Sequence, residues 1–250
     1  MEEIEIFEDE RIDDLEYKGL KIIQNKKGFC FGVDAVLLSD YAKKIKKGST
    51  VVDIGTGTGI VSILLCGKTN LKKIYGIEIQ EEVANMAKRS IKLNGLDDRF
   101  EVINADIKDC FGSLEKYKYD AVVTNPPYKK VDTGAKNIDK RQLISRHEVE
   151  CTLEDIIKNA SQLLKDLGEF YMVHRAERIV DIFCTLRKYK LEPKNIRFVH
   201  PKIGEKPNLV LVKAVKCAKE FLKIDDPLVI YREDGEYTDE IYEIYGKKRK

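Results

Sequence analysis

Histidine and cysteine are scarce in this sequence, and neither has the spacing of a metal site or a disulfide framework. Three histidines and six cysteines are spread over 250 residues. The cysteines form no C-x-x-C motif, and no histidine stands beside a second ligand at metal spacing. We therefore expect no metal cofactor, and we expect reduced thiols, as in a cytoplasmic protein.

Long apolar runs and a large net charge are also missing. No apolar run approaches the roughly 20 residues that a helix needs to cross a bilayer, and the acidic N-terminus is unlike a signal peptide. The net charge of +2 is far below the basic surplus that is typical of a nucleic-acid-binding domain. These features exclude a membrane protein, favour the cytoplasm, and argue against a broad basic surface.

The length suits one α/β domain with short appendages, because a second full domain would be crowded within 250 residues. Apolar residues make up 43% of the chain, which is enough for a sizeable core. We divide the chain into an N-terminal hairpin or cover segment (1–33), a main domain (34–216) and a C-terminal extension with a small hairpin (217–250), ending in a frayed segment from residue 242.

Short apolar segments alternate with helical patterns along the main domain, which predicts a mostly parallel sheet covered on both faces. An amphipathic helix over 34–46, with Asp34 as its N-cap, precedes the first strand, and a short helix is expected over 107–115. The stretch 129–150 lacks periodicity and is rich in charge, so we interpret it as a mobile loop over an active site. The expected strands are 50–54, 73–78, 100–104, 119–124, 168–173, and an antiparallel edge pair at 194–199 and 208–215.

The tetrapeptide Asn125-Pro126-Pro127-Tyr128 follows the expected strand 119–124 and suits the methylation of a poorly nucleophilic nitrogen. The Asn125 side-chain oxygen and the Pro126 carbonyl can accept from the N–H groups of an exocyclic amine. They would thereby favour the tetrahedral nitrogen that develops during attack, without a strong base. Tyr128 offers a flat face for a planar base or amide. The alternative is a proline-terminated strand and a turn, since Asn-Pro commonly initiates turns.

A glycine-rich turn seventy residues upstream favours the functional interpretation. Asp53 precedes a G-x-G-x-G sequence at 55–59, and an apolar helix follows. Glycines allow close approach of a ligand to the backbone at the positive end of a helix dipole. The next strand ends at Glu78, where an acid can bind both hydroxyls of a ribose. The third strand is followed by Asp106, which is placed to accept from an adenine amine.

This order of motifs resembles the class I S-adenosylmethionine-dependent methyltransferases, which have a Rossmann-like, seven-stranded, mostly parallel sheet. The segments 28–38, 146–148 and 197–202 are further similar to the bacterial valine-tRNA adenine-N6 methyltransferases. The resemblance implies N6-methylation of the adenine 3′ of the anticodon of a valine tRNA. It also implies a catalytic role for Asn125, Pro126 and Tyr128, and contacts of S-adenosylmethionine with Phe31, Asp34, Asp53, Gly55, Gly57, Gly59, Glu78, Ile79, Ala105, Asp106 and Asn125.

Two basic clusters are candidates for RNA contacts. The lysines at 43–47 are more simply a solvated face. The second cluster directly follows Tyr128, and we expect Lys129, Lys130 and Arg146 to hold backbone phosphates near the catalytic pocket. His147 and Glu148 either fix this loop or cap the following helix.

Three other functions remain open from the sequence. Enzymes that methylate DNA adenine, ribosomal RNA or a protein glutamine share Asn-Pro-Pro-Tyr, although 250 residues leave little room for the target-recognition domain of a DNA methyltransferase. A nicotinamide-dependent dehydrogenase would need G-x-G-x-x-G spacing and would leave residues 125–128 without a role. An inactive RNA-binding methyltransferase fold would not require every motif residue to be intact.

Overall fold

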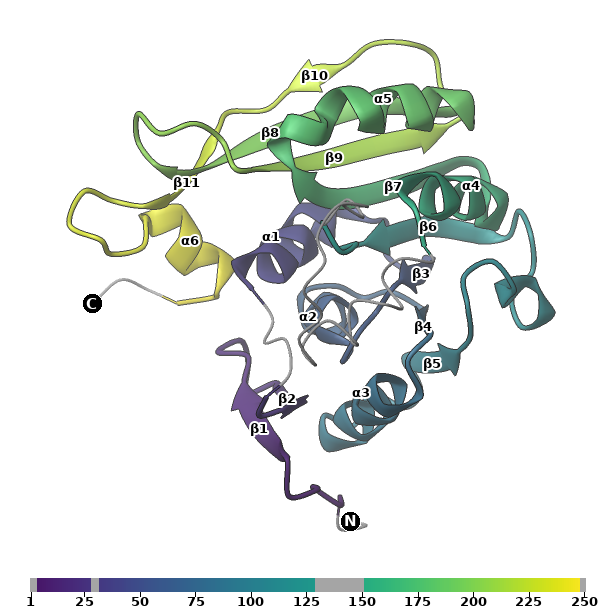
Figure 1. The fold of residues 1–250 in the computed structure, drawn as a ribbon, viewed down its shortest axis with the longest axis vertical. Coiled ribbons are helices and arrows are strands. Elements are labelled where there is room, and N and C mark those ends of the chain that lie inside the picture. The colour runs from purple at the N-terminus through teal and green to yellow at the C-terminus, as the bar shows by residue number, and fades with distance from the viewer. Residues whose placement is uncertain (1–3, 28–31, 129–150, 248–250) are drawn as a thin grey trace, which may run out of the picture.

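A computed structural model describes residues 4–27, 32–128 and 151–247 of the chain. Its centre is a nine-stranded sheet, with a separate two-stranded hairpin near the N-terminus (Figure 1). Strand β9 runs antiparallel to both of its neighbours, and the other described pairs of this sheet are parallel. In spatial order the strands are β10 (Lys223–Ile224), β8 (Leu191–Lys202), β9 (Leu209–Lys216), β7 (Leu164–Arg175), β6 (Tyr119–Thr124), β3 (Thr50–Ile54), β4 (Lys73–Glu78) and β5 (Phe100–Asn104), and β11 (Leu228–Tyr231) also pairs with β8.

The expected mostly parallel α/β fold is confirmed, and each of the seven expected strands is present. One detail of the prediction is wrong, because the antiparallel strand β9 lies inside the sheet and not at its edge. The two short strands β10 and β11 pair with the outer side of β8 and extend the sheet to nine strands. Strand β11 lies within residues 227–231, where the sequence predicts the first strand of the small C-terminal hairpin, but its pairing with β8 was not expected. Strand β10 has only two residues, which is too short to give a distinctive sequence pattern.

Helices cover both faces of the sheet because successive strand residues point to opposite sides. Val51 and Val123 pack into one apolar cluster, whereas Val52 and Val122 pack into the other. The first cluster also contains residues of α1 (Val33–Tyr41), α2 (Ile60–Lys68) and α3 (Glu81–Leu93), and the second contains residues of α4 (Leu153–Leu163) and α5 (Ile179–Lys188). Within the described segments, no helix is both long enough and apolar enough to cross a membrane.

Two local predictions about helices are wrong. Helix α1 begins at Val33 with Gly32 as its N-cap, so Asp34 lies in the first turn and does not cap the helix. The helix is also not amphipathic, since its residues 34–39 are all buried between the sheet and its neighbours. The expected helix at 107–115 is reduced to one 3-10 turn, Cys110–Gly112.

Both ends of the described chain pack against the main domain (Figure 1). The N-terminal hairpin of β1 (Glu10–Asp14) and β2 (Lys21–Asn25) lies on α3, where the Ile23 N–H donates to Ser90 Oγ at 2.9 Å. The expected C-terminal hairpin is present as a single antiparallel bridge between Tyr231 and Tyr237. The prediction that the chain is frayed from residue 242 is wrong for the described residues. Helix α6 (Asp239–Ile244) buries the side chains of Ile241 and Ile244.

Candidate active site

The sequence motifs meet at one edge of the sheet because they follow the carboxyl ends of four adjacent parallel strands. Ile54 at the end of β3 pairs with Ile77 on one side and with Thr124 on the other. Glu78 at the end of β4 pairs with Asn104 at the end of β5. The glycine-rich turn, Glu78, Asp106 and Asn125 therefore occupy neighbouring positions, although about seventy residues separate the first from the last. This edge is where open α/β sheets bind their ligands.

The glycine-rich turn depends on positive φ angles at three positions. Gly55, Gly57 and Gly59 have φ values of 69°, 58° and 93°, which side chains rarely adopt. A Cβ atom on Gly55 or Gly57 would stand in open space, with no heavy atom within 4 Å. The backbone of the turn is therefore bare on this side, and a ligand can approach it closely.

The turn is held in place by Asp53, which is only 1% exposed. Its Oδ2 atom accepts hydrogen bonds from Thr56 Oγ1 at 2.8 Å and from Ser62 Oγ at 2.7 Å. Burial raises the pKa of Asp53 to about 6, and the two hydroxyl groups partly oppose this shift. Asp53 therefore fixes the conformation of the turn and of the first part of α2.

Glu78 connects the end of β4 to the same turn. Its Oε2 atom accepts from the Gly57 N–H at 3.0 Å, and its Oε1 atom accepts from the Gln80 N–H at 2.9 Å. The side chain is buried, and burial raises its pKa. Each carboxylate oxygen has a further lone pair, so Glu78 can accept two hydroxyl donors in the position that was expected for a ribose.

The end of β5 completes the proposed adenine side of the site. Asn104 donates from Nδ2 to the carbonyls of Glu78 and Ile79, at 2.8 and 3.1 Å, and so ties the ends of β4 and β5 together. Ala105 and Asp106 are half-buried, and the side chain of Ile79 is 40% exposed. Asp106 Oδ1 accepts from the Lys108 N–H at 2.8 Å. An exposed apolar side chain and a carboxylate thus follow the paired ends of β4 and β5, where the sequence predicts contacts to an adenine ring and its amine.

The tetrapeptide 125–128 begins where β6 ends. Thr124 fixes this point because its Oγ1 donates to the Ile54 carbonyl at 2.9 Å. Pro126 is buried, whereas Asn125 and Tyr128 are half-buried. The Tyr128 hydroxyl lies 2.7 Å from Asn125 Oδ1 and 2.7 Å from Asp34 Oδ2. Asp34 thus reaches the tetrapeptide from the first turn of α1, an interaction that the sequence did not suggest.

The ring of Tyr128 contacts two residues at the end of β7. The Arg175 guanidinium lies over the ring, 5.3 Å from its centroid, and His174 meets it edge-on at 5.3 Å between centroids. His174 is buried, as expected for a structural histidine, and burial lowers its pKa to about 4. Arg175 is exposed and adds a positive charge beside Tyr128.

Several predicted site residues lie outside the described segments. They are Phe31, which was assigned to the cofactor, the RNA-contact candidates Lys129, Lys130 and Arg146, and the neighbouring residues His147 and Glu148. The expected mobile loop 129–150 is outside them as well.

Sequence reasoning missed some residues that build the site. Gly76 in the middle of β4 is one, because a Cβ atom there would lie 2.8 Å from Thr56 Cγ2 and 2.9 Å from Phe100. A lone glycine within a strand is a recognisable signal of close backbone approach. Asn104 and Arg175 had no such signal, since a polar residue after a strand is common.

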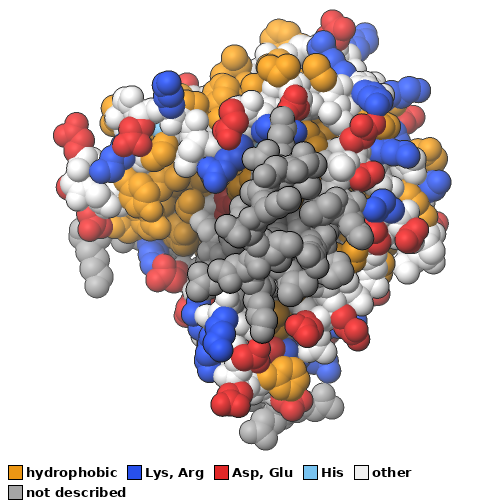
Figure 2. All heavy atoms as spheres, in the orientation of Figure 1, with side chains coloured by type: hydrophobic (Ala, Val, Ile, Leu, Met, Phe, Trp, Pro, Cys, Tyr) orange, Lys and Arg blue, Asp and Glu red, His pale blue; other side chains and the backbone are white. Residues whose placement is uncertain are grey.

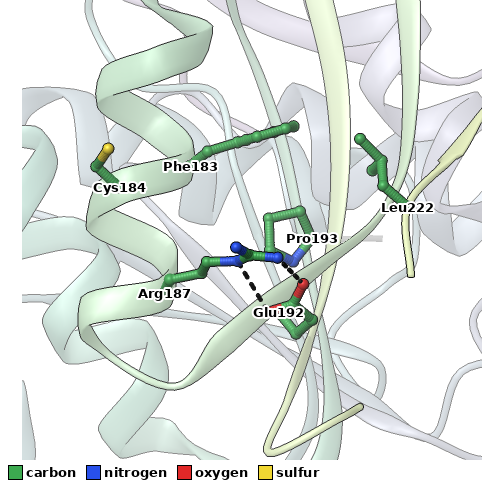
Figure 3. Close-up of a pocket in the computed structure, with 6 residues that line it drawn as sticks. All are labelled: Phe183, Cys184, Arg187, Glu192, Pro193 and Leu222. Carbon is green, nitrogen blue, oxygen red and sulfur yellow. Dashed lines mark hydrogen bonds and ion pairs between the residues drawn. The ribbon is translucent and has the colours of Figure 1, made fainter. Parts of the chain in front are cut away.

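A separate apolar pocket of about 250 Å³ lies between α5 and β8 (Figure 3). Phe183, Pro193 and Leu222 contribute to its lining. The charged groups drawn there neutralise each other, because Arg187 donates to Glu192 at 2.8 Å. The pocket involves the C-terminal half of α5 and the beginning of β8, so it does not belong to the edge that carries the motifs.

The comparisons with known proteins agree with this geometry. A family model described as methyltransferase small domain matches residues 32–182, more than half of the chain. The chain is 28% identical over 237 residues to the tRNA1(Val) (adenine(37)-N6)-methyltransferase of Porphyromonas gingivalis, and the match covers 91% of each chain.

Solved structures support the fold. A crystal structure described as a predicted O-methyltransferase from Agrobacterium tumefaciens superimposes with a TM-score of 0.69 at 21% identity, covering 85% of this chain and 95% of the other. A geranyl diphosphate methyltransferase in complex with S-adenosylmethionine superimposes with a TM-score of 0.53 at 16% identity, covering 74% of this chain and 84% of the other.

Proposed function

Since this chain belongs to the methyltransferase small domain family, we propose that it transfers the methyl group of S-adenosylmethionine to N6 of an adenine in tRNA. The target that we propose is adenine 37 of a valine tRNA, the position named for the relatives in Porphyromonas gingivalis and other bacteria. The observation that carries the proposal is the position of Asn125 to Tyr128 directly beside the glycine-rich turn, at the ends of the adjacent strands β6 and β3.

The residues at this edge fit S-adenosylmethionine. The backbone at Gly55 and Gly57 faces open space and carries no side chain, so the cofactor could approach it closely. Glu78 would accept from the ribose hydroxyls, and Asp106 from the adenine amine, with Ile79 and Ala105 against the adenine ring. The cofactor supplies a methyl group on a sulfonium, which is a good leaving group.

The target amine would be bound by acceptors and would not be deprotonated by a base before attack. The extra proton of the methylated nitrogen would pass to water after the transfer. An adenine N6 has its lone pair delocalised into the ring, and this lone pair becomes localised as the nitrogen turns tetrahedral. Asn125 Oδ1 and the Pro126 carbonyl would accept from its two N–H groups and stabilise that geometry more than the planar one. The ring of Tyr128 would hold the base by stacking, and positioning of the two reactants would provide much of the rate.

A base in the anticodon loop is accessible to such a site because it is already single-stranded. The charge distribution agrees with local contacts to RNA. On the face drawn in Figure 2, Lys and Arg side chains of the described segments are interspersed with Asp and Glu. We therefore assign the binding of RNA backbone phosphates to a small number of basic side chains near residues 125–128. The candidates are Lys129, Lys130 and Arg146, which follow Tyr128 in the sequence but lie outside the described segments, with Arg175 beside Tyr128.

Incubation with total RNA and methyl-labelled S-adenosylmethionine tests the reaction type. RNA lacking N6-methyladenine at this position should be used, and nucleosides should be separated by mass spectrometry. We expect labelled N6-methyladenosine in the tRNA fraction. Label in ribosomal RNA, or on a glutamine of an added protein extract, would move the activity to another enzyme class with the same tetrapeptide. No label in any fraction would favour an inactive RNA-binding fold.

A further inference from the structure

The Tyr128 hydroxyl lies between two oxygen atoms but has a single proton. Asp34 Oδ2 and Asn125 Oδ1 are each 2.7 Å from Tyr128 Oη. A phenol donates one hydrogen bond and can accept others. In one of the two interactions the Tyr128 oxygen must therefore accept, and its partner must donate. Of the two partners, only the side-chain amide of Asn125 has N–H groups that can donate.

Asp34 is the stronger competitor for the phenol proton. Its carboxylate lies in the first turn of α1, where the positive end of the helix dipole favours negative charge. Its Oδ1 atom accepts from the Ala35 N–H at 2.9 Å, which leaves Oδ2 for Tyr128. Hydrogen bonds to a charged acceptor are roughly twice as strong as neutral ones. Burial and the nearby Asp34 charge also raise the pKa of Tyr128, so the phenol keeps its proton.

The position of Asp34 is built into the start of α1. Gly32 has no side chain, and a Cβ atom there would lie 2.7 Å from Asp34 Oδ1. Gly32 has a φ of −97°, which any residue can adopt, so the glycine provides space and not a special conformation. Asp34 is buried, and within the described part of the chain its side chain accepts hydrogen bonds from Ala35 and Tyr128.

We propose that Asp34 is a positioning residue that orients the catalytic amide of Asn125 through the hydroxyl of Tyr128. Tyr128 donates to Asp34, so Asn125 must rotate its amide by 180° and donate from Nδ2 to Tyr128 Oη. This rotation exchanges nitrogen and oxygen without changing the shape of the group. It directs Oδ1 away from Tyr128, where it can accept from the amine of the target base. The inference rests on the proposed function, because it assigns Oδ1 the acceptor role in methyl transfer.

The variant Asp34→Asn inverts this arrangement. The Ala35 N–H still needs an oxygen, so the new amide places Oδ1 there and Nδ2 toward Tyr128. Tyr128 then accepts a hydrogen bond from Nδ2 of residue 34 and donates its own to Asn125 Oδ1. That oxygen is therefore no longer available to the substrate. We expect kcat with a valine tRNA transcript to fall about tenfold or more, as when a transition-state acceptor is weakened or removed. The KM for tRNA should stay the same. The Kd for S-adenosylmethionine should also stay the same, in contrast to the cofactor contact that the family resemblance implies for Asp34, because both oxygens of its carboxylate accept from Ala35 and Tyr128.

The double variant separates positioning from a structural role. Tyr128→Phe removes the connection between residues 34 and 125, so it should lower kcat less than Asp34→Asn does, because the amide is then free to take either orientation. Adding Asp34→Asn to Tyr128→Phe should have no further effect, and the double variant should be more active than Asp34→Asn alone. If the two decreases in kcat simply multiply, the proposal is wrong. A weaker Kd for S-adenosylmethionine in Asp34→Asn would also overturn it, because Asp34 would then be a cofactor ligand.

A second measurement needs no substrate and keeps this inference distinct from the proposed function. In ¹⁵N-labelled protein, Asn125→Asp identifies the side-chain amide signals of Asn125. One of the two Nδ2 protons should be shifted and slow to exchange in the native protein, and it should lose both properties in Asp34→Asn and in Tyr128→Phe. Unchanged Asn125 signals in Asp34→Asn would contradict the proposal. A native protein that methylates no RNA but shows the expected signals would disprove the proposed function and leave the orientation of the amide established.

Discussion

The backbone N–H of Gly57 donates a hydrogen bond of 3.0 Å to Oε2 of Glu78. The glycine-rich turn and the acid at the end of β4 are therefore one unit and not two independent motifs. The other oxygen of Glu78 accepts from Gln80 at the start of α3, so a single carboxylate connects the turn, β4 and α3. A change at Glu78 should affect both the proposed ribose contacts and the order of the turn.

The first prediction is that Glu78→Ala weakens the binding of S-adenosylmethionine by about tenfold or more. Hydrogen bonds to a charged group contribute about 1.5–3 kcal/mol each, and about 1.4 kcal/mol corresponds to a factor of ten in Kd. Titration calorimetry measures the change. Glu101→Ala, which removes a more exposed carboxylate from the neighbouring strand, is the control and should bind as the native protein does. Equal affinities of the two variants for S-adenosylmethionine would show that Glu78 does not bind the cofactor.

The second prediction concerns turnover. Asn125→Ala should lower kcat roughly 100-fold or more, because one acceptor of the developing tetrahedral nitrogen is removed. The Kd for S-adenosylmethionine should change little, since Gly57 and Glu78 remain in place. Single-turnover kinetics with saturating tRNA separate these effects. If Asn125→Ala keeps the native kcat, Asn125 has no catalytic role and only forms part of a turn.

The third prediction is a pH dependence of stability through His174. Its folded pKa is lowered to about 4 from 6.5 by burial, and its Nδ1 accepts from the Arg175 N–H at 2.8 Å. Between these pH values the unfolded chain binds a proton that the folded protein does not, so stability falls as the pH falls from about 6.5 to about 4. The decrease from this group is at most on the order of 3 kcal/mol.

His174→Asn is the control for this effect, because its side-chain oxygen can accept from the Arg175 N–H without titrating. Urea denaturation at several pH values compares the two proteins. The native protein should lose stability relative to the variant on acidification. Parallel curves would show that His174 is not held in its neutral form.

The fourth prediction concerns RNA. Replacing Lys129, Lys130 and Arg146 together by alanine should weaken tRNA binding and reduce the slope of log K against log salt, by about 0.7–0.9 for each phosphate that is no longer neutralised. The matched control replaces the lysines 44, 46 and 47, which are exposed near the amino end of β3, away from the motif edge. This control should keep the native slope. If both triple variants behave alike, binding depends on total charge and not on Lys129, Lys130 and Arg146.

The strands of the main domain could be predicted because each is a short apolar segment that ends in a recognisable polar or glycine signal. The placement of Asp53, Glu78 and Asp106 at one edge followed from parallel strand order alone. Gly57 and Glu78 are twenty-one residues apart, and the hydrogen bond between them is a direct consequence of β3 and β4 being adjacent.

Interactions between distant segments could not be predicted in this way. Asp34 and Tyr128 are ninety-four residues apart and belong to elements that do not follow each other along the chain. At the sequence level, Asp34 before an apolar run had the pattern of an N-cap, and only the packing of α1 shows that it reaches Tyr128. Similarly, the C-terminal residues looked frayed because their burial depends on segments that are distant in sequence. Ile244 belongs to the apolar cluster that contains residues of α1 and α2, and Lys68 Nζ donates to the Ile244 carbonyl at 2.6 Å. The division of the chain at residues 33 and 216 stays a prediction.

The central claim is most directly tested with two valine tRNA transcripts that differ only at position 37. One carries adenine there and the other guanine, and each is incubated with the protein and S-adenosylmethionine before nuclease digestion and mass spectrometry of the anticodon-loop fragment. We predict one added methyl group, recovered as N6-methyladenosine, on the adenine transcript and none on the guanine transcript. Methylation of both transcripts at another position, or of neither while the protein binds S-adenosylmethionine, would contradict the assignment.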